Sequence, residues 1–172
     1  MRHVTLLTTG GTIEKTYDER SGELSNRGSI VRRMLRRLRL EGTRVSIVEL
    51  MSKDSLFMTD ADRETIAAAV ETHQASTDGV VILHGTDTLA VTGEILHQRF
   101  HPPRIPVILT GAMRPYEMKR SDALQNLTES IFAGGVLPPA VYCVTHGRAL
   151  RFPGVVKDRE SGTFIIPQPV GG

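Results

Sequence analysis

Short apolar runs alternate along the chain with longer amphipathic segments, and this alternation limits the possible folds more than any other feature. The apolar runs, which predict buried strands, cover residues 4–8, 44–50, 80–84, 106–110 and 140–144. The segments with helical spacing cover residues 29–40, 63–74, 88–100 and 122–132, and Asp60 is the predicted N-cap of the second helix. Strands that alternate with helices predict an α/β fold of three layers, with a mainly parallel sheet and helices on both faces. After Gly147 the periodicity weakens, and we expect only short strands and turns.

Composition indicates an ordinary globular domain. The chain has 172 residues, of which 40% are hydrophobic and 23% charged, so it can bury one sizeable core. Its single cysteine, Cys143, excludes a disulfide within the chain, and the apolar neighbours of this residue predict a buried strand position. No apolar stretch is long enough for a signal peptide or a membrane span, so we expect a cytoplasmic protein without a membrane partner.

One stretch of the sequence is strongly basic, although the formal net charge of the chain is only +2. This stretch holds Arg32, Arg33, Arg36, Arg37 and Arg39. Apolar residues between the arginines repeat at helical spacing, which favours a helix with a buried stripe and a solvated basic face over an RNA or phosphate site. We therefore expect no nucleic-acid partner.

Polar loops follow four of the predicted strands. They are Thr9-Gly10-Gly11-Thr12, Lys53-Asp54-Ser55, His84-Gly85-Thr86-Asp87 and Thr110-Gly111-Ala112. Ligands of parallel sheets bind beyond the carboxyl ends of the strands, so these loops are the candidate site.

The chemistry of single loops leaves alternatives open. Gly10 and Gly11 suit either a phosphate cradle or a structural turn, and Thr88 is better explained as a helix N-cap than as a site residue. Thr86 and Asp87 together, next to a glycine, are harder to explain as caps. A threonine hydroxyl needs a base or a neighbouring cation to become a nucleophile. Lys157 could supply this, because a partly desolvated lysine can act as a base, or it could pair on the surface with Asp158 or Glu160.

Four motifs, in order, carry a resemblance to a known family. Thr-Gly-Gly-Thr-Ile at positions 9–13 and His-Gly-Thr-Asp-Thr at 84–88 resemble the two signature segments of the bacterial-type L-asparaginase/glutaminase family. The segment 109–115, Leu-Thr-Gly-Ala-Met-Arg-Pro, and the segment 121–127 resemble the stretches that follow in that family. The similarity extends from residue 4 to about residue 169.

The resemblance implies hydrolysis of L-asparagine to L-aspartate and ammonia, with L-glutamine as a weaker substrate and with no metal or organic cofactor. It assigns the nucleophile to Thr12, a lid tyrosine to Tyr17, and the second catalytic group to Thr86, Asp87 and Lys157. It assigns substrate binding to Gly11, Asp54, Ser55, Gly85, Thr86, Asp87 and Ala112. Segment 14–27, directly after Thr12, is the expected lid.

Length is the main departure from the family, whose members are usually about twice as long and carry a second α/β domain. We therefore expect residues 1–172 to form a single catalytic domain of the N-terminal type, assembled as a homo-oligomer, dimer or tetramer, with sites near a subunit interface. Leu56 and Phe57 stand where several members carry a polar residue that contacts substrate, which affects glutamine use. The alternatives are an amino-acid sensor, a half-enzyme that needs a partner chain, and a nucleotide-binding α/β protein.

Overall fold

The computed structural model describes residues 1–168, and its centre is a six-stranded sheet in the order β4-β1-β5-β6-β7-β8. Its strands are β1 (Arg2–Gly10), β4 (Thr43–Lys53), β5 (Gly79–Leu83), β6 (Val107–Thr110), β7 (Val141–Thr145) and β8 (Arg148–Arg151). The first five are parallel and only β8 runs antiparallel, against β7. The predicted sheet is thus confirmed.

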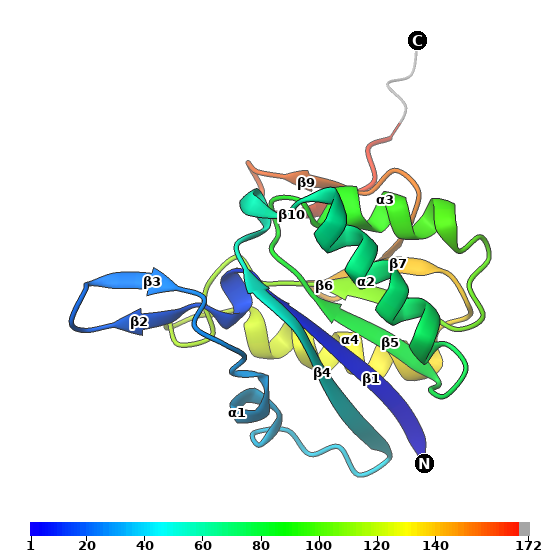
Figure 1. Ribbon diagram of the computed structural model, residues 1–172, viewed down its shortest axis with the longest axis horizontal. Coiled ribbons are helices and arrows are strands. Elements are labelled where there is room, and N and C mark those ends of the chain that lie inside the picture. The colour runs from blue at the N-terminus through cyan, green and yellow to red at the C-terminus, as the bar shows by residue number, and fades with distance from the viewer. Residues whose placement is uncertain (169–172) are drawn as a thin grey trace.

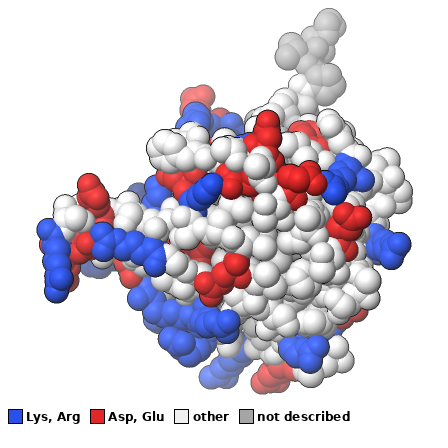
Figure 2. Space-filling view, in the orientation of Figure 1, with Lys and Arg blue, Asp and Glu red and all other residues white. Residues whose placement is uncertain are grey.

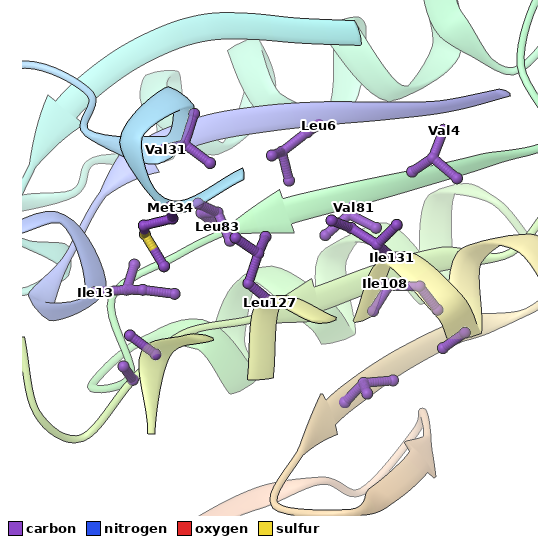
Figure 3. Close-up of a cluster of buried hydrophobic side chains, with 14 of the residues drawn as sticks. Val4, Leu6, Ile13, Val31, Met34, Val81, Leu83, Ile108, Leu127 and Ile131 are labelled. Atoms are coloured by element: carbon purple, nitrogen blue, oxygen red, sulfur yellow. The ribbon is translucent and has the colours of Figure 1, made fainter. Parts of the chain in front are cut away.

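Helices cover both faces of the sheet, as predicted (Figure 1). The four helices are α1 (Val31–Leu35), α2 (Asp60–His73), α3 (Leu89–Arg99) and α4 (Ala123–Val136). Neighbouring strand residues point to opposite faces, so Leu6 packs in the core beneath α1 and α4 while Leu7 packs beneath α2 and α3. Figure 3 shows the first of these cores, where Leu127 and Ile131 of α4 meet the strands. Within residues 1–168 no helix is both long enough and apolar enough to cross a membrane.

Two predicted helix boundaries were wrong. The helix predicted over residues 29–40 is a single turn, α1, followed by the turn bonds Arg37 N to Met34 O and Leu38 N to Leu35 O. Arginines three and four residues apart repel each other, which disfavours a longer helix here. The N-cap of α2 is Thr59 and not Asp60; the Thr59 hydroxyl accepts from Asp62 N, and the Asp62 carboxylate accepts from Thr59 N.

Two small hairpins flank the sheet. β2 (Thr16–Asp18) pairs with β3 (Glu23–Ser25), and β9 (Val156–Asp158) pairs with β10 (Thr163–Ile165). The β2–β3 hairpin lies in the segment expected to be the lid and extends away from the sheet (Figure 1). The β9–β10 hairpin lies beside the carboxyl ends of the strands, and this placement brings Lys157 to the candidate site.

Candidate functional site

The loops after β1, β4, β5 and β6 meet through glycines, which lets their backbones touch. A Cβ on Gly10 would lie 2.4 Å from Lys53 N, and one on Gly11 would lie 2.5 Å from Gly85 Cα. A Cβ on Gly85 would lie 2.4 Å from Ser55 Oγ, and one on Gly111 would lie 2.4 Å from His84 O. Any larger residue at these positions would push the loops apart, so the glycines place the hydroxyl-bearing residues beside one another.

The first loop places Thr12 at the start of the 3-10 helix η1 (Thr12–Glu14). Gly11 has φ +76°, in the left-handed region, and donates its N–H to Lys53 O over 2.8 Å. The Thr12 hydroxyl makes no hydrogen bond within residues 1–168, whereas the Thr9 hydroxyl is buried and donates to Leu83 O. Thr9 therefore ties β1 to β5, and Thr12 keeps an uncommitted hydroxyl.

Thr86, Asp87 and Lys157 form one hydrogen-bonded cluster. Lys157 Nζ donates to Thr86 Oγ1 over 2.8 Å and to Asp87 Oδ1 over 2.9 Å. The Lys157 ammonium, and secondarily the Arg159 guanidinium 3.1 Å from Asp87 Oδ1, hold the pKa of the Asp87 carboxyl below its usual value. Sequence analysis missed Arg159, although it lies two residues after Lys157, the period at which strand residues share a face.

Ser55 lies at the start of the 3-10 helix η2 (Ser55–Phe57), and its side chain is 1% exposed. Its hydroxyl has no hydrogen-bond partner among the described residues. Buried hydroxyls nearly always make a hydrogen bond, so the Ser55 hydroxyl is available to bind a ligand. Thr88 occupies the N-cap position of α3, but its hydroxyl makes no cap bond. It donates instead to Ser55 O, which ties the start of α3 to η2.

Asp54 is occupied by contacts within the protein. One carboxylate oxygen accepts from Lys15 Nζ over 2.7 Å, and the other accepts from Leu56 N over 3.1 Å. The Lys15 ammonium holds the pKa of Asp54 below its usual value. Lys15 and Asn26, whose amide donates to Gly11 O, were missed by sequence analysis, and both anchor the β2–β3 hairpin next to Thr12.

Two other expected site residues, Tyr17 and Ala112, contribute no side-chain hydrogen bond to the site within residues 1–168. Tyr17 lies on β2 with 56% of its surface exposed, and its backbone N–H donates to Glu117 Oε2 over 3.0 Å. Ala112 follows β6 and is 1% exposed, within the core beneath α4. The structure thus gathers the hydroxyls, Asp87 and Lys157 at the sheet edge, and leaves Tyr17 outside.

Glu14 is a buried acid directly beneath the first loop. It accepts hydrogen bonds from Gly10 N over 3.2 Å and from the Ser29 hydroxyl. It therefore joins the chain just before the β2–β3 hairpin to the chain just after it. Burial raises the pKa of Glu14 to about 7. The neighbouring loop holds His84, fully buried and bonded to Gly85 O and Thr92 Oγ1, and burial lowers the pKa of this imidazole to about 4.

The fold and the loops define an α/β protein with a polar site, rich in hydroxyl groups, at the carboxyl edge of a parallel sheet. Residues 3–163 match the family model described as Asparaginase, N-terminal. The chain therefore belongs to the asparaginase family, and the resemblance drawn from its motifs is confirmed.

Individual relatives agree with this assignment. The chain is 33% identical over 137 residues to an L-asparaginase of Thermococcus kodakarensis, a match that covers 80% of this chain and 42% of the relative. It is equally 33% identical, over 142 residues, to one of the subunits of the glutamyl-tRNA(Gln) amidotransferase of Thermoplasma acidophilum, covering 77% of this chain and 33% of that protein.

Solved structures show the same fold. The thermostable L-asparaginase from Thermococcus kodakarensis superposes with a TM-score of 0.83 at 30% identity, over 95% of this chain and 51% of that one. A probable cytoplasmic L-asparaginase from Campylobacter jejuni gives a TM-score of 0.83 at 25% identity and covers 97% of this chain and 52% of that one. The chain thus spans about a third to a half of the length of these relatives.

Proposed function

We propose that this protein hydrolyses the side-chain amide of L-asparagine to L-aspartate and ammonia. Its family supports amidohydrolase activity, and the hydrogen bond from Lys157 Nζ to Thr86 Oγ1 is the observation that carries the proposal. An ammonium ion in contact with a nearly buried threonine hydroxyl is an arrangement for moving protons at a reacting centre. A merely structural lysine on β9 would instead pair with Asp158 or Glu160, and Lys157 pairs with neither.

In the proposed mechanism, Thr12 Oγ attacks the amide carbon of the substrate. The hydroxyl proton goes to the leaving nitrogen, so ammonia departs and an acyl ester on Thr12 remains. Water then attacks this ester, and its proton passes by way of the Thr86 hydroxyl to Thr12 Oγ, which releases aspartate and restores the Thr12 hydroxyl, while the Lys157 ammonium orients Thr86. The backbone at Gly11, Gly85 and Ala112 lines the space for the amide group.

Charge complementarity would select the substrate. The unpartnered Ser55 hydroxyl would donate to the α-carboxylate, and the ionised Asp87 carboxylate would bind the α-ammonium group. Asp54 would act beside Ser55, where its bond to Leu56 N fixes the start of η2. Tyr17 would reach Thr12 only after the β2–β3 hairpin closes over the site.

A second candidate is a half-enzyme that acts only with a partner chain. The similarity to a component of a glutamyl-tRNA(Gln) amidotransferase, at the same identity as to the asparaginase, supports this candidate. In it, the same threonine site would release ammonia for use by another protein chain. An amino-acid sensor without catalysis is less well supported, because it has no need of the Thr86–Lys157 contact.

We also propose that residues 1–172 act as one catalytic domain in a cytoplasmic homo-oligomer, with substrate recognition completed at a subunit interface. The family model that matches residues 3–163 supports one catalytic domain. Analytical ultracentrifugation with and without L-asparagine measures this assembly, and a monomer with full activity would contradict it.

Ammonia release from L-asparagine by the purified protein tests the proposal. We expect turnover by the wild type and its loss in Thr12→Ala and Thr86→Ala, each with an unchanged circular dichroism spectrum. Asparagine binding without turnover, measured by calorimetry, would replace the proposal by a sensor or a half-enzyme. Turnover restored by a partner chain would distinguish the half-enzyme.

A further inference from the structure

Positive charge is concentrated on a surface formed by two segments far apart in sequence. Segment 28–40, which contains α1, and segment 111–121, between β6 and α4, together hold eight basic residues and one acid, Glu117. The rest of the chain holds thirteen basic and eighteen acidic residues, so the remainder is acidic. Figure 2 shows part of this surface as a group of Lys and Arg side chains over α1, below the β2–β3 hairpin.

A pocket of about 640 Å³ lies where the two segments meet. Its charged lining consists of Arg33, Arg37, Arg120 and Glu117, and its apolar lining includes Tyr116, Met118 and Leu124. This volume lies within the range of small-molecule sites. The pocket does not include any residue of the proposed asparagine site.

The arginines of this pocket are only partly neutralised. Arg33 pairs with Glu117 over 2.5 Å and lies 5.5 Å from the centre of the Tyr116 ring. Within residues 1–168, Arg37 and Arg120 make no ion pair. Guanidinium groups that converge without enough carboxylates favour phosphate, which they bind through parallel hydrogen bonds.

We propose that this pocket binds a free nucleotide, with its phosphates on Arg33, Arg37 and Arg120. The base would lie against Tyr116, Met118 and Leu124, because aromatic and apolar surfaces stabilise a base by stacking. A solvated helix face explains the arginines of α1 but does not explain why Arg120 and an aromatic side chain join them in one pocket. The proposal is independent of the proposed amidohydrolase activity.

One residue of the pocket, Glu117, also contacts the β2–β3 hairpin, which links ligand binding to that segment. Glu117 Oε1 pairs with Arg33, while Glu117 Oε2 accepts from Tyr17 N. Phosphates bound to Arg33 would compete with Glu117 for the guanidinium. We expect ATP to change the rate of proteolytic cleavage between residues 15 and 27.

Titration calorimetry with ATP at low salt tests the proposal, with Arg37→Gln, Arg120→Gln and the double variant beside the wild type. We expect each single variant to weaken ATP binding by about tenfold and the double variant to abolish it. Arg151→Gln, an exposed arginine on β8, is the matched control and should bind like the wild type. Unchanged circular dichroism spectra show that the variants are folded.

Two further probes distinguish the source of any binding. Inorganic tripolyphosphate should bind more weakly than ATP, because it lacks the base. Equal affinity for the two would overturn the role of Tyr116, and failure of ATP to bind would overturn the proposal. Binding of a single-stranded RNA oligonucleotide without binding of ATP would also overturn it, in favour of a surface for polyanions whose affinity falls steeply with salt.

Discussion

Lys157 Nζ and Thr86 Oγ1 lie 2.8 Å apart, although 71 residues separate them in the sequence. This contact joins the β9–β10 hairpin to the loop after β5. The Asp87 carboxylate accepts a hydrogen bond from the same ammonium group over 2.9 Å, so one side chain of the hairpin orients both polar groups of that loop. If this cluster moves protons, its function depends on the ammonium and not on packing alone.

Replacement of Lys157 by methionine, which keeps the length of the side chain, should lower turnover of L-asparagine by about 10² to 10⁴-fold, the usual range for loss of a proton-transferring group. Steady-state kinetics give this value. Arg159→Gln is the graded control, because the Arg159 side chain is 72% exposed and its one ion pair within residues 1–168 is with Asp87. It should change turnover by less than about tenfold. Full turnover in Lys157→Met would remove Lys157 from the mechanism.

Gly85→Ala should disrupt the site, because the new Cβ would lie 2.4 Å from Ser55 Oγ and would push η2 away. We expect an increased KM and a loss of about 1–3 kcal/mol in the free energy of unfolding. Gly42→Ala is the matched control, because nothing lies within 4 Å of its added Cβ, and its effect should stay within about 0.5 kcal/mol. Urea denaturation and kinetics measure both, and equal behaviour of the two variants would contradict the close packing of the loops.

The Lys15–Asp54 ion pair should restrain the β2–β3 hairpin. Its two side chains are 23% and 28% exposed, so Asp54→Asn should cost only about 0.2–1 kcal/mol of global stability. Local opening of the β2–β3 hairpin should increase more than global unfolding does. Limited proteolysis between residues 15 and 27 detects this opening. Asp60→Asn is the control, since the Asp60 side chain is fully exposed. Equal cleavage of both variants would show that the ion pair does not hold the hairpin.

Glu14 and His84 should oppose each other in the pH dependence of stability. The pKa of Glu14 is raised from 4.5 to about 7, so the folded state gains stability as pH falls through this window. The pKa of His84 is lowered from 6.5 to about 4, so the folded state loses stability as pH falls from 6.5 to 4. Each shift corresponds to roughly 3 kcal/mol, and the two nearly cancel between pH 6.5 and 4.5.

Glu14→Gln should reveal the contribution of His84. The wild type should show nearly constant free energy of unfolding between pH 6.5 and 4.5, while the variant should lose about 2–3 kcal/mol over the same interval. At pH 8 the variant should be more stable than the wild type, because it buries no charge there. Urea denaturation at each pH measures these values, and parallel curves for the two proteins would contradict the raised pKa of Glu14.

Sequence patterns predicted the layers of the fold because each strand is a short apolar run covered on both faces. They predicted α1 poorly, since the spacing of Val31, Met34 and Leu38 shows which residues are buried but does not include the repulsion between arginines. The α2 N-cap was misplaced by one residue, because the capping box of Thr59 uses Asp62 in place of the more common Glu or Gln.

Motifs identified the residues that the structure gathers at the sheet edge, because consecutive parallel strands end at the same place. They could not reveal the pairing of Lys15 with Asp54 or of Arg33 with Glu117, because these contacts join segments 39 and 84 residues apart. The exposed position of Tyr17 could not be predicted from the sequence either, since it depends on the direction in which the β2–β3 hairpin extends.

The β9–β10 hairpin has a consequence for the order in which the protein matures. All five parallel strands end by residue 145, so the parallel sheet precedes Lys157 in the order of synthesis. A nascent chain could therefore fold its core with the Thr86 hydroxyl in place and still lack the ammonium group beside it. The core would become stable first, and chemical competence would follow only when the β9–β10 hairpin emerges.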